Sequence, residues 1–272
     1  MDERTRYLEA LLQQLKESVD IQAIFLGGSL ANGTADDYSD IDLRIIVSDL
    51  VDRRSYLEAF VASQPDILFV ENLSRTYTVV HFKAFFKLDL FAYKKEEVIA
   101  STWLNRITII KDTHDQYLAK IKDHSKTLVF EPTQELFNQL MNKYIAYLHE
   151  GYRKGQRGAM LFVEQCLLHM KHILLSLYRL LAKQEPNSLG DWSKYEGPHS
   201  RFTVEQTASI RACRLNGEKT LADTIQALNH DVRKHALLLA REQGLTFDAE
   251  MFDEACQLVD FQGISLIKEK DE

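Results

Sequence analysis

Residues 21–47 read IQAIFLGGSLANGTADDYSDIDLRIIV, and this stretch decides the first half of the fold. Its opening apolar run, residues 21–26, is typical of a β-strand. The strand leads directly into Gly27, Gly28 and Ser29. Two glycines and a serine indicate a turn whose backbone N–H groups and hydroxyl can hold phosphate oxygens. The stretch therefore predicts a strand that ends at a phosphate-binding turn.

Two carboxylates, Asp40 and Asp42, follow the turn after a ten-residue spacer and begin a second predicted strand, residues 41–47. Side chains alternate between the two faces of a strand, so these two carboxylates point the same way. Like charges at this spacing repel each other unless a cation lies between them, and a divalent metal is the usual cation. A phosphate-binding turn beside paired carboxylates indicates phosphoryl or nucleotidyl transfer.

A third carboxylate, Asp89, lies in the middle of a predicted apolar strand, residues 85–93. Central strands disfavour aspartate, and burying an unpaired charge is costly, so this residue needs an explanation. If its strand lies beside residues 41–47, Asp89 meets Asp40 and Asp42. The three carboxylates would then form a cluster able to hold one or two Mg²⁺ ions.

Other charged residues surround these carboxylates in the sequence. Lys87 and Arg44 share the faces of the acidic residues, and each can pair with a carboxylate or approach a phosphate. Ion pairing across the sheet is the simpler interpretation. Asp36 and Asp37 compete as metal ligands, but they lie in a turn-like stretch where solvation of a loop is the better interpretation.

The chain of 272 residues is long enough for one large domain or two medium ones, and its character changes after residue 130. In the first half we expect helices over 3–19 and 53–63 and strands over 21–26, 41–47, 67–70, 76–82, 85–93 and 107–110. In the second half we expect helices over 134–151, 158–183, 204–215, 220–242 and 248–258. The sequence thus predicts an α/β (α+β) domain with a mixed sheet over residues 1–128. An all-α helical-bundle domain follows over residues 129–272.

Composition narrows the possible partners. The net charge of −7 argues against a broad nucleic-acid-binding surface and suits a small, cationic substrate. The three cysteines lie far apart without metal-ligand spacing, which indicates reduced thiols in a cytoplasmic protein. No signal peptide is visible and no run is long enough to predict a membrane span, so we expect a cytoplasmic location and no membrane partner.

The N-terminal pattern as a set resembles the polymerase-β-type nucleotidyltransferase superfamily. It is most similar to the bacterial antibiotic nucleotidyltransferases, which include aminoglycoside and lincosamide adenylyltransferases. The resemblance covers residues 27–89 and rests on Gly27-Gly28-Ser29, the spacer, Asp40-Ile41-Asp42 and Asp89. Trp103 and the sequence ITIIKD at 107–112 resemble the strand and acidic turn that close the catalytic domain in these families. Their usual plan is an α/β catalytic domain followed by a helical domain.

The resemblance implies roles for individual residues. Gly27, Gly28 and Ser29 would contact the nucleotide phosphates, and Asp40 and Asp42 would bind Mg²⁺. For the position of Asp89 it implies either a third metal ligand or the general base that acts on the acceptor hydroxyl. Several relatives carry the longer glutamate here, so the role of metal ligand is favoured for Asp89.

The helical half offers a weaker pattern. Four residues recur every seven positions along or beside the predicted helix 158–183: Arg157, Glu164, Lys171 and Tyr178. Glu164 is a candidate base for the acceptor, and Lys171 is a candidate contact to the triphosphate or to the leaving pyrophosphate. A solvated helix face with ion pairs is the favoured interpretation. Trp192, Tyr195 and His199 lie in a loop of the kind that often lines a binding pocket.

The predicted function is Mg²⁺-dependent transfer of a nucleoside monophosphate, AMP from ATP, to a hydroxyl of a small molecule, with release of pyrophosphate. An aminoglycoside is the favoured acceptor because an acidic protein attracts a polycation, and a lincosamide is the alternative. A nucleotide-binding regulatory or antitoxin-like protein and a protein adenylyltransferase share the same motif and are further alternatives. The sequence indicates neither the base preference nor the oligomeric state.

Overall fold

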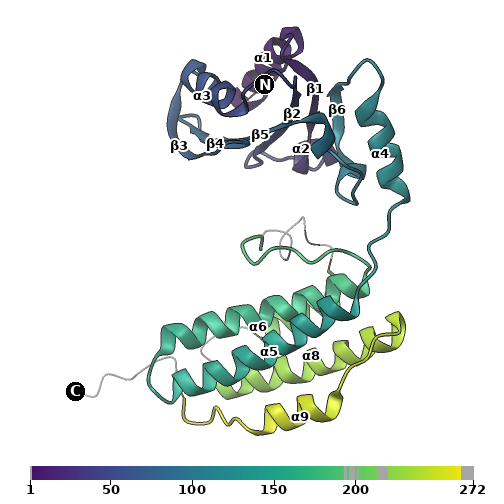
Figure 1. Cartoon of the computed structure of the whole chain (residues 1–272). Helices are drawn as coiled ribbons and strands as arrows, with labels where there is room; N and C mark the ends of the chain where they lie inside the picture. Colours follow the sequence, from purple (N-terminus) through teal and green to yellow (C-terminus); the bar gives the residue numbers. More distant parts are fainter. Residues whose placement is uncertain (1, 193–194, 196–199, 201, 214–219, 265–272) are drawn as a thin grey trace, which may run out of the picture. The chain divides into compact units, whose positions relative to one another are not determined.

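The computed structural model describes residues 2–192, 195, 200, 202–213 and 220–264 (Figure 1). The chain folds into two compact units, Met1–Leu128 and Val129–Glu272, which we call the N-terminal unit and the helical unit. The division falls where the sequence analysis places the domain boundary.

The N-terminal unit is built on a six-stranded sheet with the strand order β3-β4-β5-β2-β1-β6. Its strands are β1 (Ile21–Leu26), β2 (Ile41–Val47), β3 (Ile67–Leu73), β4 (Tyr77–Phe82), β5 (Lys87–Tyr93) and β6 (Thr108–Lys111). Neighbouring strands run antiparallel except for β2 and β5, which are parallel. The predicted mixed sheet is therefore confirmed.

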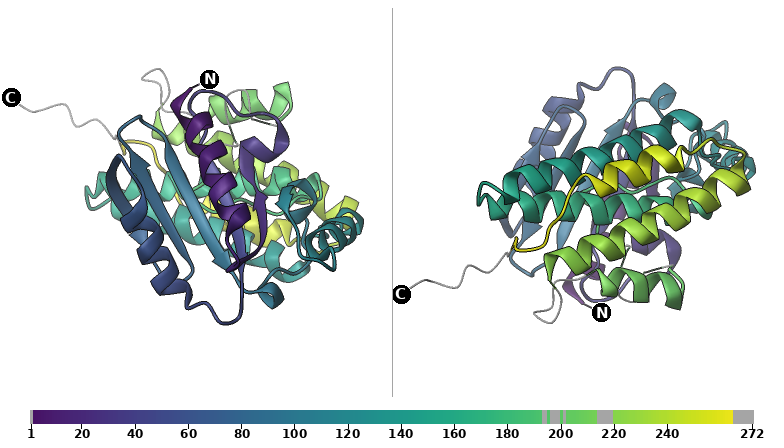
Figure 2. Two further views of the ribbon diagram at one scale, coloured as in Figure 1. Left: turned by 90° about the horizontal axis from the view of Figure 1, so that it is seen from above. Right: turned by 90° about the horizontal axis from the view of Figure 1, so that it is seen from below.

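Helices α1 (Glu3–Glu17) and α3 (Arg53–Ser63) lie on one side of this sheet (Figure 1 and Figure 2). Asp2 and Asp52 cap their N-termini by accepting backbone N–H groups, which explains where each helix begins. Apolar residues at helical spacing are buried from both helices, together with every second residue of β2: Leu8, Leu11, Leu15, Leu57, Phe60, Ile41, Leu43, Ile45 and Val47. The intervening residues of β2 face away from this core.

The other face of the sheet is covered in part by η2 (Leu104–Arg106) and α4 (Tyr117–Thr127). A second apolar cluster on this face contains Phe25, Ile46 and Leu118. The sequence analysis missed α4, whose second and third N–H groups donate to Asp112, a residue outside the helix. Its carboxylate accepts hydrogen bonds from Leu118 and Ala119 at 2.9 Å each.

Most expected elements are present with ends that differ by one to four residues, and two of the differences bear on the site. The strand expected from residue 85 begins at Lys87, because Phe85 adopts a φ of 62° in the turn before β5. The turn expected at Gly27 to Ser29 opens a short helix, α2 (Gly28–Asn32), which ends at Gly33 in the left-handed conformation. Both differences follow from backbone geometry that hydrophobic periodicity does not report.

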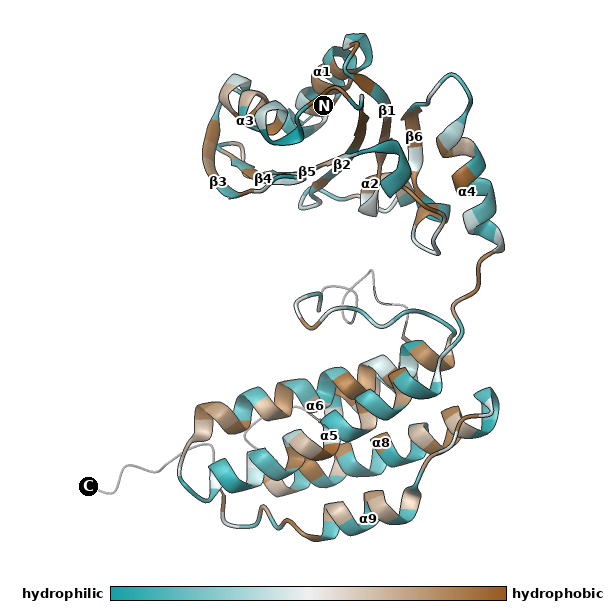
Figure 3. Ribbon diagram, in the orientation of Figure 1, coloured by the Kyte–Doolittle hydropathy of each residue, from teal (hydrophilic) through white to brown (hydrophobic). Residues whose placement is uncertain are grey.

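The described part of the helical unit contains helices and no strand, as predicted. Its helices are α5 (Gln134–Gly155), α6 (Met160–Leu181), α7 (Val204–Ala212), α8 (Leu221–Gln243) and α9 (Ala249–Gln257). Helix α6 packs against both α5 and α8, and Figure 3 shows hydrophobic and hydrophilic residues alternating along α5 and α6. The core of this unit includes Tyr144, Leu167, Leu174 and Leu228.

By length and composition α6 could cross a membrane, which corrects the expectation that no run is long enough. Half of its most apolar window is buried inside the structure. Leu167, Met170, Leu174 and Leu177 of α6 all belong to the core of the helical unit. The apolar character of α6 is therefore accounted for by its central place in that core.

Candidate active site

Asp42 and Asp89 lie directly opposite each other on neighbouring strands. They are paired in the parallel register of β2 and β5, so both side chains leave the same face of the sheet. That face is opposite the one packed on α1 and α3. Asp40 lies just before β2 and is about half exposed. The strand pairing on which the predicted carboxylate cluster depends is therefore present.

Gly28 packs closely against Asp42. Its φ is +58°, a conformation that favours glycine, and a Cβ atom there would come within 1.8 Å of Asp42 Oδ2. The neighbouring Gly27 donates its backbone N–H to the carbonyl of Asp42 at 2.9 Å. The end of β1 and the start of β2 thus hold the predicted phosphate-binding turn beside a predicted metal ligand.

Gly27 is restricted by a different pair of side chains. A Cβ atom on Gly27 would lie 2.8 Å from both Arg44 Nη1 and Trp103 Cζ2. The guanidinium of Arg44 is held between two rings, 5.0 Å from the centroid of Phe91 and 4.5 Å from that of Trp103. It also approaches Asp42 Oδ1 at 3.4 Å. The structure therefore places a positive charge beside both Gly27 of the turn and Asp42.

Lys87 bridges the other two carboxylates. Its Nζ donates to Asp40 Oδ2 at 3.0 Å and to Asp89 Oδ2 at 3.2 Å. Burial raises the pKa of Asp89, and the charge and hydrogen bond of Lys87 only partly oppose this. Burial lowers the pKa of Lys87, but its hydrogen bonds and charge contacts with Asp40 and Asp89 outweigh that effect and raise it. Lys87 is therefore the partner that keeps these two partly buried carboxylates together.

No set of three or more metal-ligating side chains is arranged around a common point within the described residues. The ammonium group of Lys87 instead joins Asp40 and Asp89. Asp89 Oδ1 is buried and has no hydrogen-bond partner in the part of the chain that the structure describes. Carboxylate oxygens are the ligands that Mg²⁺ prefers, so the donor chemistry and this unpartnered oxygen fit a bound Mg²⁺.

The remaining candidate residues lie elsewhere. Asp36 and Asp37 are exposed in the loop before β2, and the carboxylate of Asp36 accepts hydrogen bonds from Tyr38 and Ser39 within that turn. In the helical unit, Glu164 is exposed on α6 and Lys171 is partly buried. The seven-residue pattern suggested that Tyr178 lies on a solvated helix face, and this prediction is wrong. Tyr178 is buried and donates to Ser209 Oγ at 2.9 Å.

An aromatic cluster on the helical unit includes two of the residues singled out in the sequence. The rings of Trp192 and Tyr195 both lie 5.9 Å from that of His172 on α6. His172 Nε2 and Tyr195 Oη are buried without hydrogen-bond partners among the described residues. His199 lies outside the described residues. Sequence reasoning missed His172 as a member of this cluster, because its contact with the loop depends on tertiary packing.

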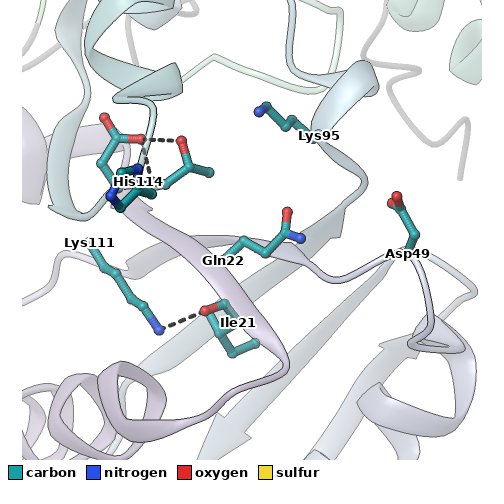
Figure 4. Close-up of a pocket in the computed structure, with 8 residues that line it drawn as sticks. Ile21, Gln22, Asp49, Lys95, Lys111 and His114 are labelled. Atoms are coloured by element: carbon teal, nitrogen blue, oxygen red, sulfur yellow. Dashed lines mark hydrogen bonds between the residues drawn. The ribbon is translucent and has the colours of Figure 1, made fainter.

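A pocket of about 420 Å³ opens at the opposite end of β1 from Gly28 (Figure 4). Its lining residues are Ile21, Gln22, Asp49, Lys95, Lys111, Asp112, Thr113 and His114. The two lysines already have structural partners, since Lys111 Nζ donates to the carbonyl of Ile21 at 2.6 Å and Lys95 pairs with Asp115. None of the lining residues belongs to the carboxylate site, so the pocket is distinct from it.

Comparison with known proteins identifies the family. The model of the streptomycin adenylyltransferase family matches residues 1–199. The chain belongs to the streptomycin adenylyltransferase family. This confirms the predicted nucleotidyltransferase superfamily and makes the protein an enzyme of the adenylyltransferase type.

Two solved structures show distant similarity to this family member. An aminoglycoside 6-adenyltransferase from Bacillus subtilis is 12% identical, with a TM-score of 0.39 over 94% of this chain and 98% of that chain. A nucleotidyltransferase-like protein from Exiguobacterium sibiricum is 16% identical, with a TM-score of 0.40 over 89% of this chain and 76% of that chain. Among curated proteins, no match to the chain is found.

Proposed function

We propose that the protein transfers AMP from ATP to a hydroxyl of an aminoglycoside of the streptomycin class, with Mg²⁺ as cofactor and pyrophosphate as the second product. The observation that carries the proposal is the register of Asp42 with Asp89 beside Gly28, in a chain of the streptomycin adenylyltransferase family. A phosphate-binding turn and carboxylates on one sheet face are what nucleotidyl transfer requires.

Asp40, Asp42 and Asp89 would hold one or two Mg²⁺ ions. The unpartnered Asp89 Oδ1 and the oxygen-only donor set support this assignment. When bound, Mg²⁺ would neutralise charge on the triphosphate and on the transition state. Asp89 would serve as a ligand rather than as a base, because its carboxylate already lies in register with that of Asp42.

The chain's own groups would prepare the donor for attack. The N–H group of Gly28 and the hydroxyl of Ser29 would bind phosphate oxygens, whereas the N–H of Gly27 already donates to the carbonyl of Asp42 and would position the turn. The acceptor hydroxyl would attack the α-phosphorus as the bond to the β-phosphate oxygen breaks, and pyrophosphate would leave. The hydroxyl proton would pass to a base, for which Glu164 is a candidate, and Lys171 is a candidate contact to the leaving pyrophosphate.

The acceptor is proposed from two observations. The family model is that of a streptomycin adenylyltransferase, and the chain carries a net charge of −7. A negative protein attracts a polycationic antibiotic and raises its local concentration. A neutral or weakly basic acceptor such as a lincosamide is attracted less strongly by the negative charge of the protein.

Pyrophosphate release with ATP and Mg²⁺ tests the proposal. We expect release with streptomycin or another aminoglycoside and none with a lincosamide. Asp42→Asn removes a predicted metal ligand and should abolish release with little change in thermal stability. Asp37→Asn is the matched control, because Asp37 is an exposed loop carboxylate close in sequence, and it should retain full activity. Full turnover by the Asp42→Asn variant would contradict the proposed site.

A further inference from the structure

Lys87 lies between two of the three carboxylates, Asp40 and Asp89. It is the first residue of β5, and its ammonium contacts Asp40 at 3.0 Å and Asp89 at 3.2 Å. The side chains of Lys87 and Asp89 are only 26% and 21% exposed, so their ion pair is better shielded than an ordinary surface pair. Lys87 therefore supplies, within the chain itself, a positive charge that these two carboxylates require.

The remaining cation of the site has a different arrangement. Arg44 is held between Phe91 and Trp103, and its contact with Asp42 is longer, at 3.4 Å. Its position is set by the two rings as well as by the carboxylate. Lys87 has a flexible four-carbon stem and a compact charged group, which can leave its partners without disturbing packed rings. Of these two cations, Lys87 is thus the one that can move away from its carboxylates when another cation binds.

A divalent ion bound by Asp40 and Asp89 would need the oxygens that Lys87 now contacts. An ammonium group and Mg²⁺ at one pair of carboxylates repel each other, since both are positively charged. Free Mg²⁺ therefore has to displace Lys87 with no compensation for the lost ion pairs. Mg²⁺ that arrives with ATP brings phosphate oxygens, which give Lys87 new negative partners.

We propose that Lys87 is a resident cation that competes with divalent metal for Asp40 and Asp89, so that the site takes up metal weakly on its own and strongly together with a nucleoside triphosphate. The inference rests on the proposed function, which supplies the metal. Lys87 is in this sense a positioning residue: it holds the carboxylates together before the substrate arrives and makes metal loading depend on that substrate.

The test is direct binding of Mn²⁺, used as a paramagnetic stand-in for Mg²⁺, to the full-length protein without nucleotide. Lys87→Met removes the competing charge and should bind Mn²⁺ at least tenfold more tightly than the unmodified protein. Lys87→Arg keeps a positive charge and should bind as weakly as the unmodified protein. Lys83→Met is the matched control and should change nothing, because Lys83 pairs with Asp66 at 3.5 Å in an exposed turn of the same unit.

Addition of a non-hydrolysable ATP analogue should remove most of the difference between the Lys87→Met variant and the unmodified protein. Thermal unfolding of each variant shows whether it is folded. If Lys87→Met does not fold, Lys87→Gln takes its place, because it also removes the charge but keeps a group that can donate to the carboxylates, and it should also bind Mn²⁺ more tightly than the unmodified protein. The role of Lys87 is overturned if the Lys87→Met variant and the unmodified protein bind Mn²⁺ with equal affinity. If Asp42→Asn loses Mn²⁺ binding in the same experiment, the proposed metal site still stands. If no protein binds Mn²⁺ even with the ATP analogue, the proposed function itself fails.

Discussion

Replacing Gly28 with alanine tests whether the backbone at the end of β1 keeps Asp42 in position for chemistry. The added Cβ would lie 1.8 Å from Asp42 Oδ2, whereas contacts shorter than 3.0 Å are essentially never seen. The carboxylate must therefore move by at least about 1.2 Å, given the same two distances. Misplacement of a catalytic group by about 1 Å commonly costs on the order of 100-fold in rate. We expect Gly28→Ala to lose AMP transfer by about that factor.

The effect on stability should be much smaller than the effect on rate. Asp42 Oδ2 is the far end of a flexible side chain, so the carboxylate can yield without disturbing the sheet. The cost that remains is the left-handed conformation at φ +58°, worth about 1–2 kcal/mol for a residue with a Cβ atom. The midpoint temperature of thermal unfolding should therefore fall by only a few degrees.

Gly33 offers a control with the same strain and no collision. Its φ is +69°, and a Cβ atom there would meet nothing within 4 Å among the described residues. Gly33→Ala should thus lose stability to a similar extent as Gly28→Ala but keep its rate of pyrophosphate release. Comparable activity in the two variants would refute the argument that contact with Asp42, rather than backbone strain, makes Gly28 necessary.

Three further predictions concern other contacts. Gly27→Ala should shift the fluorescence of Trp103, whose Cζ2 lies 2.8 Å from the added Cβ; an unchanged emission spectrum would contradict this packing. Burial lowers the pKa of His235, so the unfolded chain takes up its proton first as the pH falls. The stability that this residue contributes is therefore present above about pH 6.5 and is lost as the pH falls through its lower folded-state pKa. Thermal unfolding from pH 7.5 to 5.5 should show this loss, and His235→Gln should reduce it. Tyr144→Phe removes a 2.8 Å hydrogen bond to Asn229 and should cost about 1 kcal/mol in chemical denaturation, with activity unchanged.

The strands and most helices could be predicted because each has a clear hydrophobic period and local end signals. Helix α1 is an example, with Leu8, Leu11 and Leu15 at helical spacing behind a capping Asp2. Helix α4 could not be predicted in the same way. Its buried residues are few, and two N–H groups of its first turn donate to Asp112, which lies outside the helix. A cap formed across a loop leaves little trace in local periodicity.

The candidate site could be predicted only in part, again because some of its contacts are formed by residues distant in the sequence. Period-two alternation placed Asp42 and Asp89 on strand faces, and the parallel register brings them together as the prediction required. Alternation does not say which way a long side chain turns. Lys87 was expected to form an ion pair, but its bridge between Asp40 and Asp89 depends on where the loop before β2 ends. That loop position is fixed by tertiary contacts.

The parallel pairing of β2 with β5 joins two antiparallel halves of one sheet, with β1 and β6 on one side and β3 and β4 on the other. Asp42 and Asp89 face each other across this seam, so their mutual repulsion acts at the point where the two halves meet. Any cation that neutralises both carboxylates therefore also stabilises the pairing of β2 with β5. Amide hydrogen exchange along β2 and β5 should become slower when a cation is bound, so cation binding at the site can be measured without a turnover assay.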